Sequence, residues 1–159
     1  FEIFCPNNKI AELWDQLVSA GVTPCGLASR DVLRLEVCYP LYGHELSDEL
    51  TPLDANLKWT VKLDKPSFLG KGSLEKVKPT YRLAKLSLDK GIPREGYPVL
   101  NKEGSPIGHI TSGTHSPSLT LGIGLGYIKT KYSQIDTTVF IEIRNKKIKA
   151  VVVKVPFLE

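Results

Sequence analysis

Residues 25–36 read Cys25-Gly26-Leu27-Ala28-Ser29-Arg30-Asp31-Val32-Leu33-Arg34-Leu35-Glu36, and the chain continues soon after as Tyr39-Pro40-Leu41-Tyr42-Gly43. Charged and apolar side chains are interleaved in the first stretch, which predicts a short amphipathic helix that is broken at Pro40. Arg30 and Arg34 share one side of such a helix, because residues four apart are neighbours on its surface. From the charge pattern alone, that side is a solvated face with Arg-to-Glu pairs.

The segment before this stretch predicts a strand and a second helix. Residues 1–4 alternate apolar and charged side chains, as a strand does, before a turn-forming run that contains proline and asparagine. Apolar residues then recur at helical spacing, so we expect an amphipathic helix over residues 9–20, with one of the two preceding asparagines as N-cap and Gly21 as its C-terminal stop. Trp14 lies on the apolar stripe and is expected in the core.

The segment after the opening stretch predicts a loop, a strand and a connector. Residues 43–52 are rich in Glu, Asp and Ser and form a polar loop, a setting in which binding sites are common. Residues 53–63 alternate around Trp59 and are expected to form a strand. Residues 65–78 are charged and glycine-containing, and they predict a short connector helix that ends a first domain. The order of strands and helices up to residue 64 indicates part of an α/β sandwich.

Beyond residue 78 the pattern changes to short apolar stretches separated by Gly, Pro and Asn turns. Five or six strands at this spacing are typical of a small β-barrel. The expected strands cover residues 81–88, 97–100, 107–111, 119–128, 138–143 and 148–155. The fold class predicted for the whole chain is therefore α+β, with a partial α/β sandwich followed by a small C-terminal β-barrel.

Composition excludes several classes of protein. The chain has 159 residues, is 42% hydrophobic and carries a net charge of +4, which indicates a globular protein without the basic stripe of a nucleic-acid binder. Its three cysteines show no paired spacing, so neither a disulfide framework nor a metal site is expected. No apolar run approaches the length of a membrane span, which predicts a soluble protein without a membrane partner. The chain has no Met and starts in the middle of a pattern, so we interpret it as a fragment.

Two motifs resemble catalytic or phosphate-binding signatures without their full pattern. The glycine run from Gly122 to Gly126 lacks the spacing and the following lysine of a phosphate loop, and a glycine-kinked barrel strand accounts for it. His109, His115, Ser112 and Ser116 are the residue types of a hydrolytic triad, but no strained nucleophile turn or orienting carboxylate accompanies them. The simpler interpretation of residues 111–117 is an ordered turn whose hydroxyl groups bond to their own backbone.

The densest basic cluster lies at the turn between the last two expected strands. Arg144, Lys146, Lys147 and Lys149 gather there. Such a cluster is either simply solvated or contacts an acidic protein or an anionic ligand tail.

Several long motifs resemble the aminomethyltransferase family, the T-protein of the glycine cleavage system. The Ala-Ser-Arg-Asp motif of the opening stretch and the Leu-Tyr-Gly-His-Glu-Leu motif at 41–46 occur in the order that the family shows. Four further sequence motifs also match the family: Thr51-Pro52-Leu53-Asp54-Ala55-Asn56-Leu57-Lys58-Trp59, Val61-Lys62-Leu63-Asp64-Lys65, Phe68-Leu69-Gly70-Lys71 and Gly108-His109-Ile110-Thr111-Ser112-Gly113-Thr114-His115-Ser116-Pro117-Ser118-Leu119. The family chain is considerably longer, and this sequence resembles its C-terminal portion.

The resemblance implies a domain organisation and a function. Residues 1–64 would be the C-terminal part of the folate-binding aminomethyltransferase domain, with a ferredoxin-like half, residues 65–78 a connector helix, and residues 79–159 the C-terminal β-barrel domain. The intact protein would transfer the one-carbon unit of an aminomethyl-lipoyl group, carried by the H-protein, to tetrahydrofolate with release of ammonia. Its compartment would be the cytoplasm in a bacterium or the mitochondrial matrix in a eukaryote.

The resemblance also names candidate site residues. Glu2 and Arg30 stand at the family's folate-contacting positions, and Trp59 is expected to line the same cavity, although it is equally suited to ordinary core. No catalytic residue is expected within these 159 residues, because the supporting Asp of the family lies upstream. Two alternatives stay open: a noncatalytic folate-binding or scaffolding module of the same fold, and the folate domain of a dimethylglycine or sarcosine dehydrogenase.

Overall fold

The computed structural model describes residues 2–154 and 156–157, in which helices precede a β-barrel. The chain divides into two compact units, one up to Arg30 and one from Asp31 onward. Helix α2, Leu27–Glu36, runs across this boundary. The α+β class and the C-terminal barrel are thereby confirmed, and the helix predicted before Pro40 ends at Glu36.

The first unit contains the 3-10 helix η1, Asn7–Lys9, and the helix α1, Ile10–Ser19. The helix predicted for residues 9–20 is confirmed, and Gly21 follows it with φ +87°, a conformation that glycine adopts without strain. The predicted asparagine N-cap is wrong, because both asparagines lie inside η1 and Lys9 takes the cap position.

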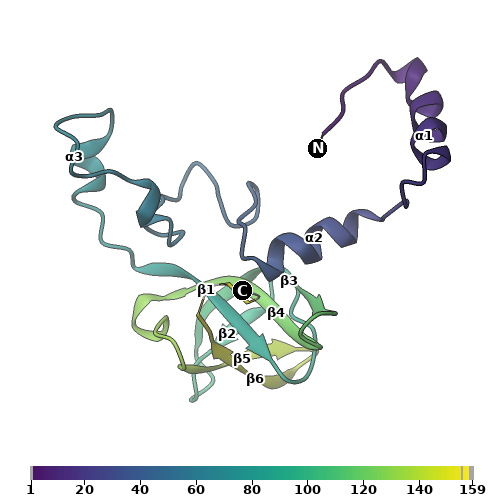
Figure 1. The fold of residues 1–159 in the computed structure, drawn as a ribbon. Coiled ribbons are helices and arrows are strands. Elements are labelled where there is room, and N and C mark those ends of the chain that lie inside the picture. Colours follow the sequence, from purple (N-terminus) through teal and green to yellow (C-terminus); the bar gives the residue numbers. More distant parts are fainter. Residues whose placement is uncertain (1, 155, 158–159) are drawn as a thin grey trace. The chain divides into compact units, whose positions relative to one another are not determined.

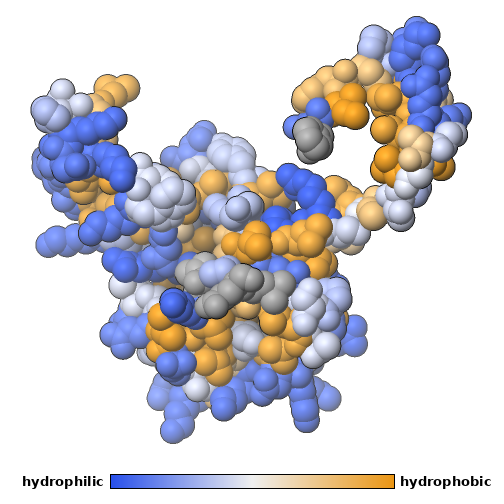
Figure 2. Space-filling view, in the orientation of Figure 1, coloured by the Kyte–Doolittle hydropathy of each residue, from blue (hydrophilic) through white to orange (hydrophobic). Residues whose placement is uncertain are grey.

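Helix α1 has an apolar stripe that this unit leaves uncovered. No residue of α1 is buried, and Trp14 is 54% exposed, so the prediction of Trp14 as core is wrong here. Figure 2 shows apolar side chains at the surface of this helix. The strand predicted for residues 1–4 begins at a residue outside the described part, and residues 2–4 form no strand. Among the described residues of the first unit, the apolar stripe of α1 has nothing to pack against, and residues 2–4 have no strand with which to pair their backbone.

Six antiparallel strands close the barrel in the order β1-β4-β3-β2-β5-β6, with β1 also pairing β6 (Figure 1). Their bounds are β1 Tyr81–Leu88, β2 Pro98–Leu100, β3 Pro106–Ser116, β4 Leu121–Lys129, β5 Thr138–Ile143 and β6 Lys146–Val152. A 3-10 helix, η3 Thr130–Tyr132, follows β4. The strands lie where the apolar stretches predicted them, although β3 extends to Ser116, beyond the predicted end at residue 111.

Two hydrophobic clusters form on opposite faces of β1 and β4. Alternate residues of the strands fill the barrel interior, as Leu86 and Ile128 do. A second cluster joins Leu83 and Leu125 to Leu35, in the last turn of α2. Because β4 is covered on both faces, its apolar residues run continuously instead of alternating with polar ones.

The glycine run predicted to be a barrel strand is confirmed as part of β4. A Cβ atom built on Gly122 would clash with the backbone oxygen of Gly91, and one on Gly124 would lie 3.0 Å from the ring of Pro93. The loop between β1 and β2 therefore packs directly on β4, and only glycine leaves room for it.

Residues 37–80 form turns, one isolated bridge between Tyr42 and Leu46, a 3-10 helix η2, Lys58–Thr60, and a short helix α3, Lys71–Leu74. The strand predicted for residues 53–63 is wrong. Its backbone bonds are mainly local, with Leu57 N–H donating to Pro52 and Thr60 N–H to Leu57. The Asp54 carbonyl also accepts from the Leu83 N–H of β1 at 2.9 Å, but an isolated bond of this kind makes no strand pair. In the described part of the chain, no helix combines the length and apolarity that crossing a membrane requires.

Candidate functional site

Arg30 projects from the exposed first part of α2. The next residue, Asp31, has its carboxylate 2.7 Å from Nε of Arg34 and so pairs with that guanidinium. No ion pair of Arg30 occurs among the residues that the structure describes. An arginine in this state can bind a carboxylate or carbonyl group of a ligand.

Arg34 lies one helical turn after Arg30 but is almost enclosed, with a side chain 10% exposed. Its Nη1 donates to Oε2 of Glu45 at 2.9 Å, and its Nη2 donates to Oγ of Ser112 on β3 at 2.8 Å. The prediction of a solvated helix face is therefore wrong for Arg34, whose guanidinium ties the helix to the barrel.

Glu45 is fully buried and has a partner for each carboxylate oxygen. Oε1 accepts from the Thr111 hydroxyl at 2.6 Å, while Oε2 accepts from Arg34 and from the Leu41 backbone N–H at 3.0 Å. The Tyr127 hydroxyl donates to the Glu45 backbone carbonyl at 2.9 Å. Burial raises the pKa of Tyr127, and nearby carboxylates add to the rise. A buried charge this well paired resists disruption, because loss of one partner leaves the other uncompensated.

A second buried carboxylate holds the end of α2. Glu36 is 3% exposed and accepts a hydrogen bond from the Ser116 hydroxyl at the end of β3. Ser116 Oγ in turn accepts from the Leu119 backbone N–H at 3.0 Å. We call Thr111, Ser112 and Ser116 the β3 hydroxyl row; all three are buried.

The β3 hydroxyl row corrects the interpretation of residues 111–117 as a turn bonded to its own backbone. All three residues of the row belong to strand β3, and their hydroxyl groups bond to Glu45, Arg34 and Glu36. His109 and His115 are exposed and take no part in these bonds, which gives the triad pattern no support. The sequence placed hydroxyl groups and charges in separate motifs, and only the fold shows that they pair.

The two other predicted site residues, Glu2 and Trp59, belong to different units of the chain. Glu2 is exposed, in a segment without regular structure, and among the described residues no hydrogen bond or ion pair joins it to Arg30. Trp59 belongs to η2 in the second unit and is 74% exposed, so it is neither strand nor core as the alternative interpretation had it.

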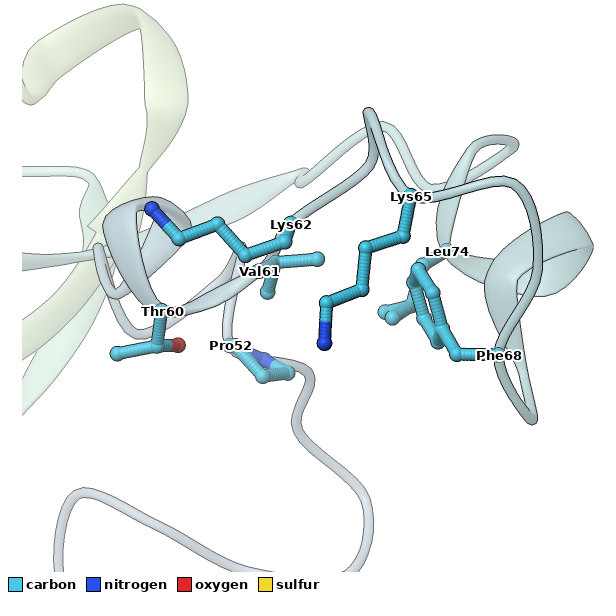
Figure 3. Close-up of a pocket in the computed structure, with 7 residues that line it drawn as sticks. All are labelled: Pro52, Thr60, Val61, Lys62, Lys65, Phe68 and Leu74. Atoms are coloured by element: carbon cyan, nitrogen blue, oxygen red, sulfur yellow. The ribbon is translucent and has the colours of Figure 1, made fainter.

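A pocket of about 360 Å³ opens beside η2, and no pattern in the sequence predicted it. Its walls are formed by Pro52, Thr60, Val61, Lys62, Lys65, Phe68 and Leu74. Figure 3 shows the ammonium groups of Lys62 and Lys65 pointing in different directions, with Lys65 reaching toward Pro52. The pocket is therefore apolar with a positive edge.

Two family models match the chain. Residues 1–65 match the GCVT N-terminal domain, and residues 82–159 match the glycine cleavage T-protein C-terminal barrel domain. The segment that neither model matches is residues 66–81, which connects the two matched regions. Every strand of the barrel is matched, except for Tyr81, the first residue of β1.

Curated relatives and a solved structure agree with these matches. The chain is 45% identical to an aminomethyltransferase of Desulforamulus reducens and 46% identical to one of Bacillus cereus, in each case over 99% of this chain and 45% of the relative. A crystal structure of the glycine cleavage system aminomethyltransferase T from Bartonella henselae is 34% identical, with a TM-score of 0.84 over 97% of this chain and 45% of that one. The chain thus spans less than half the length of these relatives. It belongs to the aminomethyltransferase family, the T-proteins of the glycine cleavage system, and corresponds to their C-terminal part.

Proposed function

We propose that this chain is the C-terminal part of an enzyme that transfers the one-carbon unit of an aminomethyl-lipoyl group to tetrahydrofolate, with release of ammonia. The observation that supports this most is Arg30, an exposed arginine whose acidic neighbour Asp31 pairs with Arg34 instead. Such a guanidinium is available to a ligand anion. Family membership supplies the reaction.

In this proposal Arg30 and Glu2 contact the folate. A guanidinium holds a carboxylate or ring carbonyl in a fixed geometry, and a carboxylate accepts hydrogen bonds from the amino and ring N–H groups of a pterin. Trp59, which is exposed, is the candidate for an apolar contact with the same ligand. No residue of this chain is assigned as acid, base or nucleophile, so its contribution is to bind and orient the acceptor.

The partner in this proposal is the lipoylated H-protein, which delivers the aminomethyl group. The expected site of action is the cytoplasm if the source is bacterial and the mitochondrial matrix if it is eukaryotic. The division into residues 1–64, 65–78 and 79–159 is part of the same proposal.

The test is ammonia release from H-protein that carries the aminomethyl-lipoyl arm. The intact protein is expected to release ammonia at a rate that depends on tetrahydrofolate, and the 159-residue chain alone is expected to show almost none, since catalytic groups that act as a set leave little rate when separated. Folate binding without ammonia release by the intact protein would favour a noncatalytic module, and oxidation of a methylated amine would favour a dehydrogenase. Turnover by the 159-residue chain at the rate of the intact protein would contradict the placement of the active site.

A further inference from the structure

We infer that strand β3 of the barrel positions Arg30 for folate, acting through helix α2 and the β3 hydroxyl row. This inference rests on the proposed function of Arg30. It gives the barrel a role in substrate binding: Thr111, Ser112 and Ser116 become positioning residues, although none of them is assigned to touch the ligand.

The first step is that β3 holds the end of α2 at two points. Arg34 bonds to Ser112, and Glu36 bonds to Ser116, four residues further along the strand. Residues four apart in a strand are separated by about 13 Å. Arg34 and Glu36 also lie on different sides of the helix, because successive residues turn by about 100°. Attachments that differ in both respects restrain the part of α2 from Asp31 to Glu36, in its direction and in its rotation about the helix axis.

The second step is that these attachments are stiff. Ser116 and Glu45 are 0% exposed, and Thr111 and Ser112 are 4% and 5% exposed. Among the described residues, no buried side-chain nitrogen or oxygen lacks a hydrogen-bond partner. Water cannot readily replace a bond in such surroundings, so each attachment is stronger than the same pair on the surface.

The third step links the network to Arg30. Arg30 lies four residues before Arg34 in the same continuous helix, a distance of about 6 Å along the axis. Arg34 also keeps the carboxylate of Asp31 in place at 2.7 Å. Loss of the hydroxyl row would let α2 tilt or rotate, and the guanidinium of Arg30 would then sample a wider range of positions than a fixed ligand can accept.

The test compares three variants of the intact protein. Thr111→Val with Ser112→Ala removes two hydroxyl groups of the row, and Thr111→Ser keeps the hydroxyl. The matched control is Thr114→Val on the same strand, because the Thr114 hydroxyl makes no side-chain hydrogen bond among the described residues. The double variant is expected to raise the Kd for tetrahydrofolate about threefold to tenfold, as for the loss of one or two hydrogen bonds, with the KM for aminomethyl H-protein unchanged. Thr111→Ser and Thr114→Val are expected to bind folate as the wild type does.

A second comparison separates positioning from general destabilisation. If the row acts through Arg30, the double variant made in an Arg30→Ala background should weaken folate binding no further than Arg30→Ala alone. The inference would be overturned if the losses of folate affinity from the double variant and from Arg30→Ala were additive. It would also be overturned if the double variant raised the KM for H-protein together with the Kd for folate. If the double variant does not fold, Ser112→Ala alone, which leaves Glu45 paired with Arg34, gives the same comparison. A wild-type protein that binds no tetrahydrofolate would overturn the proposed function itself, whereas normal wild-type binding with an unchanged Kd in the double variant would overturn only the inference.

Discussion

Lys85 on β1 shows how one residue can oppose the stability of the fold that encloses it. It is 7% exposed and lies on the same face of the strand as Leu83, which belongs to the cluster under α2. Desolvation by burial lowers the pKa of Lys85 from its ordinary value of 10.5, and a smaller opposite effect comes from Cys38. A lysine in this position is unfavourable when charged.

The sign of the pH dependence follows from this shift. Between its lowered pKa and 10.5, Lys85 is mostly neutral in the folded chain and protonated in the unfolded chain, so its contribution to the free energy of unfolding rises with pH. Lys85→Met should therefore melt higher than the wild type at pH 7, by roughly 2–4 °C for each kcal/mol relieved, and the difference should shrink as the pH approaches 10.5.

Thermal unfolding of the 159-residue chain between pH 7 and pH 10 measures this difference. Burial raises the pKa values of Cys38 and Tyr127, which lowers stability at high pH. The Tyr127 effect is common to wild type and variant, whereas the charge of Lys85 also lowers the pKa of Cys38, so the comparison reports Lys85 together with its effect on that thiol. Lys78→Met at an exposed position is the control. A Lys85→Met chain that melts lower than the wild type by the same amount at every pH would show that the lysine stem stabilises the fold by packing.

Arg30 and Arg34 mark the limit of what the sequence predicts at this scale. Helical spacing placed both on one side of a helix, and this is confirmed. It could not tell that Arg34 is enclosed, because the groups that enclose it, Glu45 and Ser112, lie 11 and 78 residues away in the chain.

At the scale of elements, the prediction of a strand succeeded where this chain also contains the neighbouring strands that pair with its backbone. The strands β1 and β5 lie within the predicted bounds, since every barrel strand finds two neighbours among the six. The prediction of a strand at residues 53–63 was wrong. The alternation around Trp59 concerns side chains only, whereas a strand also needs a neighbouring strand to bond to its backbone N–H and C=O groups.

The packing of the β1–β2 loop on β4 makes a prediction about glycine. Gly122→Ala should push the new methyl group into the backbone oxygen of Gly91 and destabilise the fold by roughly 1–3 kcal/mol, the usual cost of overpacking. Gly72→Ala is the matched control, since nothing lies within 4 Å of a Cβ atom there and alanine favours helix α3. Urea unfolding of both variants checks this, and equal midpoints for Gly122→Ala and wild type would mean that the loop yields without cost.

For the whole molecule, the sequence predicted the barrel in detail and the first unit only in part. Most apolar side chains of the barrel are covered by other parts of the same unit, so periodicity and burial agree. In α1 the stripe that contains Ile10, Trp14 and Val18 is predicted correctly as a stripe, yet it remains exposed. A periodic pattern identifies the face that must be covered but not the segment that covers it. The same limit applies to the site: motif resemblance named Glu2, Arg30 and Trp59, and no pattern in the sequence shows how such distant residues would meet around a ligand.

The central claim is that Arg30 binds tetrahydrofolate, and the most direct measurement is the Kd for tetrahydrofolate by calorimetry. It compares the intact wild-type protein with Arg30→Ala and with Arg82→Ala, which removes an exposed arginine of the barrel. We predict that Arg30→Ala weakens binding by roughly 1–3 kcal/mol, as for the loss of a charged hydrogen-bond partner, while Arg82→Ala binds as the wild type does. A folded Arg30→Ala protein with the Kd of the wild type would contradict the account.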